Sequence, residues 1–234
     1  MKVCVLNFSG NVGKTTVASH LLQPRMDAPV FSVETLNQDA AADGLDVERV
    51  KGSRYGDLQR KLVAMDAAIV DVGSSNVETF LSLMEQYDGS HEDYDYFLVP
   101  TVKDKKQTAD TVNTILALHR IGVGPERIKV VFNKVAPNDD VKEEFQPIFG
   151  MHLQGLVSVD EKASIHQNEV FELIKEVDDI SLAAVIASEG DFRQAVRDAT
   201  TPTDKEAAIN RLAIKRLSTT CGRNLDAVYA ALFQ

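Results

Sequence analysis

The chain has 234 residues, of which 44% are hydrophobic, and its net charge is −10. That apolar content is enough for one sizeable core, whereas the acidic balance argues against a protein that coats nucleic acid generally. The two cysteines, Cys4 and Cys221, provide neither a disulfide framework nor a metal-ligand spacing. Because no signal peptide and no apolar run of ~20 residues are recognisable, we expect a cytoplasmic protein without a membrane span.

Short apolar runs alternate along the chain with longer amphipathic segments. Strands are predicted at residues 3–6, 30–34, 67–71, 96–100, 127–133 and 153–157. Helices are predicted at residues 17–22, stopping before Pro24, and at 55–65, 76–86, 105–121, 139–149 and 204–218. This alternation predicts an α/β fold with a doubly wound, mostly parallel sheet and helices on both faces. We expect a single domain over residues 1–234, with a helical C-terminal extension over residues 180–234.

A glycine-containing loop follows the first predicted strand and opens the first helix. Such a loop directs backbone N–H groups at phosphate oxygens, and the helix amino terminus adds its positive end. Lys14 would reach the outer phosphates, and the Thr15 hydroxyl would bind Mg²⁺. The alternative is an ordinary strand–turn–helix corner. The nucleotide-binding residues expected in this stretch are Gly10, Asn11, Val12, Gly13, Lys14, Thr15 and Thr16.

A carboxylate closes the strand at residues 67–71. Asp71 is placed to hold Mg²⁺ opposite Thr15, and the Gly73 N–H is placed for a γ-phosphate. The alternative is that Asp71 merely flanks the start of the next helix, which Ser74 or Ser75 would cap.

The loop resembles the deviant phosphate loop of the ParA/MinD family of ATPases, which reads Lys-Gly-Gly-x-Gly-Lys-Thr-Thr. The resemblance implies a ParA/MinD-like P-loop NTPase fold, with ATP and Mg²⁺ as cofactors and catalytic roles for Lys14 and Asp71. Here Ser9 replaces the signature lysine and Asn11 replaces the second glycine. In the family that lysine contacts nucleotide across an ATP-dependent homodimer, so the replacement bears directly on dimerisation.

The segment after the second strand resembles the family's Asp-x-Asp-Pro-Gln segment. Glu34 matches its first acid, whereas Leu36 stands where the second aspartate positions water. Glu34 and Asp39 are therefore the candidate catalytic carboxylates, with solvated loop acids as the alternative. Leu36 at this position predicts slow hydrolysis, and the resemblance implies a weak ATPase that is stimulated by a partner.

The predicted strand at residues 127–133 ends in a segment that resembles the base-reading corner of P-loop proteins. Ala136 stands where GTPases place an aspartate for guanine, whereas the Asn133 amide suits the N6 and N7 atoms of adenine. A turn asparagine is the alternative. Asp160 lies in a loop that is similar to the family's second base-contacting loop. Asn133 and Asp160 therefore complete the expected nucleotide-binding residues.

The C-terminal segment differs in charge from the rest of the chain. Residues 203–234 contain five basic and three acidic residues, a net charge of +2, against −12 for the preceding residues. The predicted DNA or partner contact consists of Lys205, Arg211, Lys215 and Arg216, which share one arc of the helix. The alternative is a solvated helix face. We expect weak, nonspecific DNA contact at most.

Within the family, the form Ser-Gly-Asn-Val-Gly-Lys-Thr-Thr is similar to that of the StbB/TraL proteins of conjugative plasmids. This resemblance implies a nucleotide switch in plasmid stability, partition, positioning or conjugative transfer, with a plasmid-encoded DNA-binding partner protein. Two alternatives are a nucleotide-gated binding module with negligible hydrolysis and a P-loop metabolic ligase of the dethiobiotin-synthetase type. ATP turnover with and without DNA, partner proteins and small carboxylic acids would distinguish the three.

Overall fold

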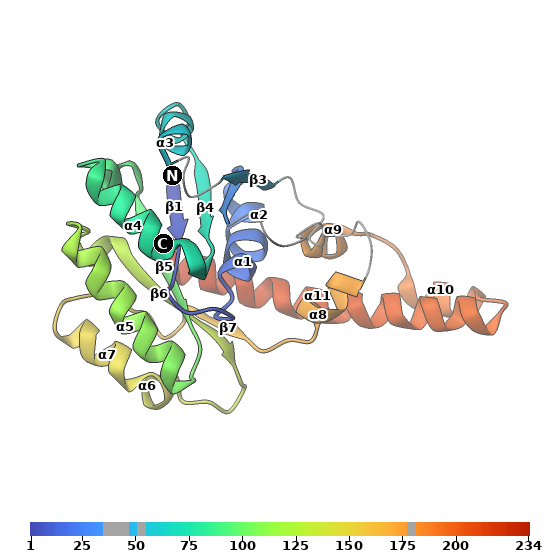
Figure 1. The fold of residues 1–234 in the computed structure, drawn as a ribbon. Helices are drawn as coiled ribbons and strands as arrows, with labels where there is room; N and C mark the ends of the chain where they lie inside the picture. Colours follow the sequence, from blue (N-terminus) through green and yellow to red (C-terminus); the bar gives the residue numbers. More distant parts are fainter. Residues whose placement is uncertain (35–46, 51–54, 177–180) are drawn as a thin grey trace.

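The computed structural model describes residues 1–34, 47–50, 55–176 and 181–234. Their strands form one parallel sheet in the order β3-β2-β4-β1-β5-β6-β7 (Figure 1). The strands are β1 (Lys2–Val5), β2 (Val30–Val33), β3 (Val47–Val50), β4 (Ala68–Val72), β5 (Tyr96–Thr101), β6 (Ile128–Val135) and β7 (Ser164–His166). β3 was not predicted, whereas β1, β2, β4, β5 and β6 lie within two residues of their predicted bounds.

Helices cover both faces of the sheet (Figure 1). They are α1 (Lys14–Thr16), α2 (Gln23–Met26), α3 (Tyr55–Val63), α4 (Val77–Gln86), α5 (Lys105–Arg120), α6 (Val141–Glu144), α7 (Gln146–Leu153), α8 (Val170–Leu173), α9 (Leu182–Ala187), α10 (Phe192–Asp198) and α11 (Pro202–Phe233). A π-helix, η1 (Val17–Leu22), joins α1 to α2, and the 3₁₀ turns are η3 (Ser74–Asn76), η4 (Ser90–Asp93), η5 (Pro125–Arg127) and η6 (Ile174–Glu176). The predicted doubly wound parallel sheet is confirmed.

Two apolar cores lie on opposite faces of the sheet. One contains Phe80 of α4 and Leu118 of α5, and the other contains Leu21 of η1 and Leu225 of α11. Both surfaces of the central strands are therefore covered, which explains why these strands are continuous apolar runs rather than alternating ones.

The strand order reverses at β1. The chain passes from β1 to β2 and β3 on one side, returns to β4 beside β1, and then builds β5, β6 and β7 on the other side. In such sheets the crevice for a ligand lies beyond the carboxyl ends of the strands at this reversal. Val5, the last residue of β1, pairs with Asp71 of β4, so the expected phosphate loop and the expected metal-binding carboxylate begin side by side.

The first helix continues through Pro24, which corrects the predicted stop. A proline removes the N–H that would bond to a carbonyl one turn earlier. Here the Arg25 guanidinium donates to the carbonyl oxygens of His20 and Leu21, both at 3.0 Å. Because these carbonyls have a substitute donor, the helical path continues from η1 into α2 and ends at Met26.

The last strand also lies elsewhere than predicted. Residues 153–157 begin at the end of α7 and continue into a turn, and the strand that extends the sheet is β7, Ser164–His166. The predicted helix over residues 139–149 is two helices, α6 and α7, which meet at Phe145, with Pro147 in the first turn of α7. Proline is accommodated there because the first N–H groups of a helix have no partner within it.

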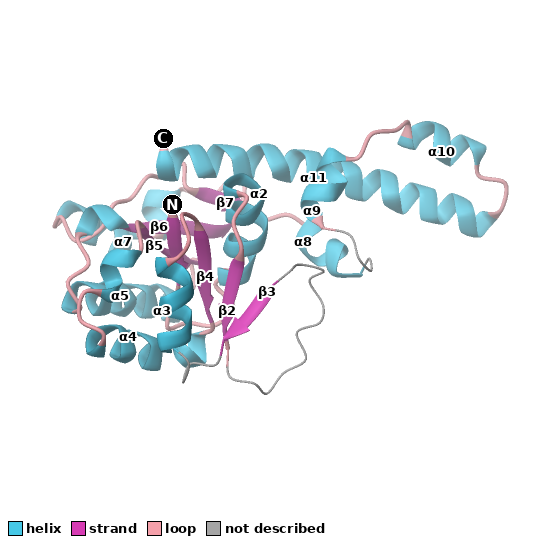
Figure 2. Ribbon diagram, turned by 90° about the horizontal axis from the view of Figure 1, so that it is seen from above, coloured by secondary structure: helices cyan, strands magenta, loops and turns pink. Residues whose placement is uncertain are grey.

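The C-terminal helix is one continuous element of 32 residues. Its second half lies along the sheet, and its first half projects beyond the body beside α10 (Figures 1 and 2). We call α10 and residues 202–216 of α11 the helical arm. Asn224 fixes the other half, because its amide donates to the Ser164 carbonyl at 3.0 Å and accepts from the His166 N–H at 2.9 Å. Among the described residues, no helix combines the length and apolarity needed to cross a membrane.

Candidate functional site

The loop between β1 and α1 is shaped by two residues with positive φ. Gly13 has a φ of 91° and Asn11 a φ of 60°. Asparagine is among the few residues other than glycine that enter the left-handed region readily, so the replacement at position 11 keeps this backbone form. Gly13 has no such substitute, because a Cβ there would also lie 1.9 Å from the Asn133 amide nitrogen. Gly10 and Asn11 are exposed, whereas Val12 is buried.

Lys14 lies folded back over this loop. Its Nζ donates to the carbonyl oxygens of Ser9 at 2.7 Å and Asn7 at 3.3 Å, and the residue is only 8% exposed. Burial lowers the pKa of the Lys14 ammonium, and the nearby Asp71 carboxylate partly offsets this effect. A buried cation on loop carbonyls is placed to neutralise an anion that the loop binds.

Thr15 and Asp71 meet across the crevice. The Thr15 hydroxyl donates to Asp71 Oδ2 at 2.8 Å, and Asp71 is 5% exposed. The Thr15 hydroxyl oxygen and the Asp71 carboxylate oxygen are metal ligands of the kind that Mg²⁺ prefers. The residues present therefore fit a magnesium ion bound beside the phosphate loop.

The Gly73 N–H is already engaged in this structure. It donates to the Val33 carbonyl at 3.0 Å, so a γ-phosphate contact requires that this bond opens first. Glu34 lies next to Gly73 at the end of β2 and is half-buried. Asp39 and Leu36 lie outside the described residues.

A buried polar network behind the loop was not recognised in the sequence. The Asn7 amide donates to the Pro100 carbonyl at 2.9 Å and to the Thr111 hydroxyl at 2.8 Å, and its oxygen accepts from the Ser9 N–H at 2.8 Å. Thr114 accepts from the Phe8 N–H at 3.1 Å. These bonds join the start of the loop to β5 and α5. The signal in the sequence is the spacing of Thr108, Thr111 and Thr114, which places three hydroxyls on one face of α5.

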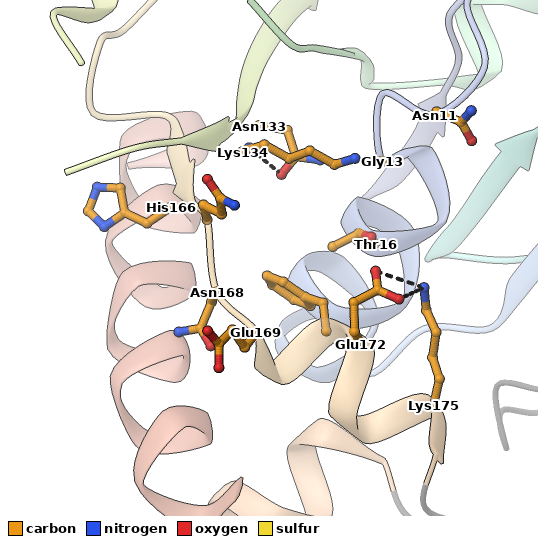
Figure 3. A pocket seen from close by; sticks show the side chains of 12 residues that line it. Asn11, Gly13, Thr16, Asn133, Lys134, His166, Asn168, Glu169, Glu172 and Lys175 are labelled. Atoms are coloured by element: carbon orange, nitrogen blue, oxygen red, sulfur yellow. Dashed lines mark hydrogen bonds and ion pairs between the residues drawn. The ribbon is translucent and has the colours of Figure 1, made fainter. Parts of the chain in front are cut away.

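A cavity of about 470 Å³ adjoins the loop on the side of β6 and β7 (Figure 3). Gly13, Thr16 and Asn133 form its inner wall, and the opposite wall comes from the segment that begins at His166, the last residue of β7. The residues of that segment which line the cavity are His166, Gln167, Asn168, Glu169, Phe171, Glu172 and Lys175. Figure 3 shows Glu172 and Lys175 paired at one side of it, with 3.3 Å between Lys175 Nζ and Glu172 Oε2.

Asp160, the other residue expected at the nucleotide, is not among the residues that line this cavity. It is exposed, and its carboxylate accepts from the Lys162 N–H at 2.8 Å. The reason is the misplaced strand. Asp160 precedes β7, whereas ligands in parallel sheets lie beyond the carboxyl ends of strands. The wall residues after His166 were missed because β7 is only three residues long.

The four basic residues of the predicted DNA or partner contact do not form one exposed surface. Lys205, Arg211 and Arg216 are exposed. Lys215 is half-buried, and its ammonium donates to the carbonyl oxygens of Val185, Ile186 and Ser188 at 2.7–2.9 Å. All three N–H groups of Lys215 are therefore used to cap the end of α9, and the predicted contact of Lys215 with DNA or a partner is corrected.

Comparison with solved structures shows that this chain has a fold similar to that of ParA/MinD-type ATPases. A ParA family ATPase from Chlorobium tepidum superposes with a TM-score of 0.51 at 15% identity, over 89% of this chain and 97% of that chain. The cell division ATPase MinD from Pyrococcus furiosus gives a TM-score of 0.52 at 13% identity, over 92% and 98%. No protein-family model and no curated protein matches the chain. The predicted ParA/MinD-like fold is thus confirmed as a fold.

Proposed function

We propose that this chain, which has the fold of the ParA/MinD-type ATPases, binds ATP with Mg²⁺ and acts as a nucleotide switch. The observation that carries the proposal is the pairing of Thr15 with Asp71 at 2.8 Å, beside a loop that is bent at Gly13 and contains Lys14. Lys14 and the loop N–H groups would hold the phosphates, and Thr15 with Asp71 would hold the metal. Bound Mg²⁺ supplies charge neutralisation for phosphoryl transfer. The base would occupy the cavity beyond Gly13.

The switch hydrolyses ATP slowly in this proposal. Leu36 replaces the acid that positions water in the family that the chain resembles, and the Gly73 N–H is bonded to Val33. Glu34 and Asp39 are the remaining candidates for the catalytic carboxylate. Ser9 is 6% exposed and replaces the signature lysine, which supports an ATP-dependent homodimer that is weak or built differently. The second candidate function is a nucleotide-gated binding module with negligible hydrolysis. It rests on the same two replacements, Leu36 and Ser9.

The finer proposal follows the resemblance of the loop to StbB/TraL proteins. It places the chain in the cytoplasm, in plasmid stability, partition or conjugative transfer, with a plasmid-encoded DNA-binding partner. It treats residues 1–234 as one domain, of which residues 180–234 are the helical extension. The exposed arm residues Lys205, Arg211 and Arg216 are the proposed contact with that partner or, weakly, with DNA.

Calorimetric titration tests the nucleotide assignment. We expect MgATP to bind more tightly than MgGTP, because Ala136 offers no acceptor for the guanine amino group. Equal affinities would refute the base assignment, and absence of binding by both would refute the switch. Turnover with DNA, a partner or small carboxylic acids then separates the candidates, since rapid turnover with a carboxylic acid alone would favour the metabolic ligase.

A further inference from the structure

The Asn133 side chain is turned towards the phosphate loop. Its Nδ2 donates to the Val12 carbonyl at 2.9 Å, and its Oδ1 accepts from the Lys134 N–H at 2.9 Å. The residue is 4% exposed, and its amide lies so close to Gly13 that no side chain fits between them. Both ends of this amide are therefore engaged with protein backbone.

A β-bulge aims Asn133 in this direction. Phe132 pairs with Ser164 and Val135 with His166, so β6 advances three residues while β7 advances two. The chain accommodates the extra residue at Lys134, which has a φ of 57°, a backbone conformation that lysine seldom adopts. Bulges re-aim side chains next to active sites, and strained residues persist where the surroundings hold them. Here the bond from the Lys134 N–H to Asn133 Oδ1 holds the bulge in place.

The bond to Val12 also sets the orientation of a loop N–H group. A trans peptide is planar, and its C=O and N–H groups point in opposite directions. The peptide between Val12 and Gly13 is trans, so fixing the Val12 carbonyl on Asn133 turns the Gly13 N–H away from β6. Asn133 thereby controls one of the loop donors on which anion binding depends.

We propose that Asn133 is a positioning residue for the phosphate loop rather than a reader of the base. This inference rests on the proposed nucleotide site and changes the role of Asn133 within it. A bidentate contact with adenine needs the nitrogen and the oxygen of the amide to face the base together. In this structure the two atoms face Val12 and Lys134. Loss of the Asn133 amide should therefore disturb phosphate binding, whatever base is attached.

The experiment compares the affinities of MgATP, MgGTP and magnesium triphosphate for the wild type and Asn133→Ala. Triphosphate has no base, so a base reader and a loop-positioning residue give opposite results. We expect both ATP and triphosphate to weaken by about tenfold, the usual effect of about one hydrogen bond, with an unchanged ratio of ATP to GTP affinity. Weaker ATP binding with unchanged triphosphate binding, or loss of the preference for ATP, would overturn the inference.

The double variant His166→Ala, Gln167→Ala is the matched control on the base side of the cavity. Both side chains are exposed there, so the fold should persist. We expect this variant to weaken ATP and leave triphosphate unchanged, the opposite pattern to that of Asn133→Ala. If it weakens both ligands equally, the triphosphate comparison does not separate base from phosphate, and the inference fails.

A second substitution covers the case in which Asn133→Ala does not fold. Asn133→Asp has nearly the same shape and keeps the acceptor for the Lys134 N–H, but it loses the donor to Val12. Its added charge repels ATP and GTP alike, so the ratio of their affinities is the readout. An unchanged ratio with weaker binding of both supports positioning, and a changed ratio refutes it. Failure of the wild type to bind any of the three ligands would instead refute the proposed function.

Discussion

The carboxyl edge of the sheet and the helical arm differ in how their polar side chains are engaged. At the edge, Asn7, Lys14 and Asn133 are at most 8% exposed, and each bonds to backbone carbonyls of the loop or its neighbours. In the arm, Lys205 and Arg211 are exposed. Burial of a polar group costs free energy unless the group is hydrogen-bonded, so the side chains at the edge have few allowed conformations. The exposed charged side chains of the arm have many.

The role of the carboxyl edge can be inferred from its own geometry. The role of the helical arm depends on the molecule that it contacts. The edge is ordered by contacts within the chain, and its chemistry can be inferred from them. The arm has little core of its own, and its function depends on a partner. Substitutions in the two regions should therefore differ in size and in kind.

The largest expected difference is in stability. Leu225 of α11 is 0% exposed within the second core, whereas Ile209 of the arm is 48% exposed. Leu225→Ala should lower the free energy of unfolding by about 2–5 kcal/mol, since it removes apolar contacts and leaves a cavity. Ile209→Ala should change it by less than about 1 kcal/mol. Urea unfolding followed by circular dichroism measures both, and equal effects would show that the arm is as tightly packed as the rest of α11.

The next largest effect concerns nucleotide affinity. Lys14→Ala should weaken MgATP binding by about a hundredfold, because charge-assisted bonds to phosphate are each worth about 1.5–3 kcal/mol. Lys105→Ala is the matched control, since Lys105 is an exposed lysine of α5 outside the loop. Calorimetry on both variants provides the comparison. Retention of full affinity by Lys14→Ala would remove the phosphate loop from the proposed site.

The phosphate-loop side of the site was predictable because its signals are local. Strand, glycine loop and helix follow one another in the sequence, and the parallel sheet brings Asp71 beside Thr15. The segment after β7 was not predictable, because Ser164–His166 contains a single apolar residue and shows no periodicity. The nearby residues 153–157 include Leu153, Leu156 and Val157 and gave a stronger but misleading strand signal. The position of β7 depends on pairing with β6, which is a long-range contact.

The same limit applies to Asn7 and Lys215. The bond from Asn7 to Thr111 joins residues 104 positions apart, so no local pattern reveals it. Helical periodicity predicted that Lys215 belongs to the basic arc. Periodicity alone does not reveal which other element of the fold packs against that arc. In the structure α9 ends against it, and the half-buried ammonium donates to three carbonyl oxygens at the end of that helix.

A moderate effect should follow from removal of this cap. Lys215→Met keeps an unbranched side chain, one atom shorter, and removes the three donors, so the carbonyls of Ile186 and Ser188 lose the ammonium while that of Val185 keeps its bond from the Ser188 hydroxyl. We expect a loss of about 1–2 kcal/mol in unfolding free energy. Lys205→Met, at an exposed position of the same helix, should change it by no more than about 0.5 kcal/mol. Thermal melting of both variants tests the difference. Equal melting temperatures would show that Lys215 does not stabilise the end of α9 and is available on the basic arc of the helix.

The smallest effect is expected on DNA binding by the arm. At ~100° per residue, Lys205 and Arg216 lie within ~20° of each other around the axis of α11. Arg211 is separated from this pair by Lys215, whose side chain contacts α9. Lys205 and Arg216 are therefore the pair that one phosphate backbone could contact together. If they do, each lost contact lowers the slope of log affinity against log salt by about 0.9 on duplex DNA.

Filter binding across a salt series, with ATP or ADP present, measures this slope for the wild type and for Lys205→Ala, Arg216→Ala. Lys215→Met is the matched control, because it removes one positive charge from the same helix without removing an exposed contact. We expect weak binding, a lower slope for the double variant and an unchanged slope for the control. Identical slopes for all three proteins would show that the arm's charges are an ordinary solvated helix surface. An equally lowered slope in the control would mean that the overall charge, −10 in the wild type, governs the approach to DNA rather than any particular pair of side chains.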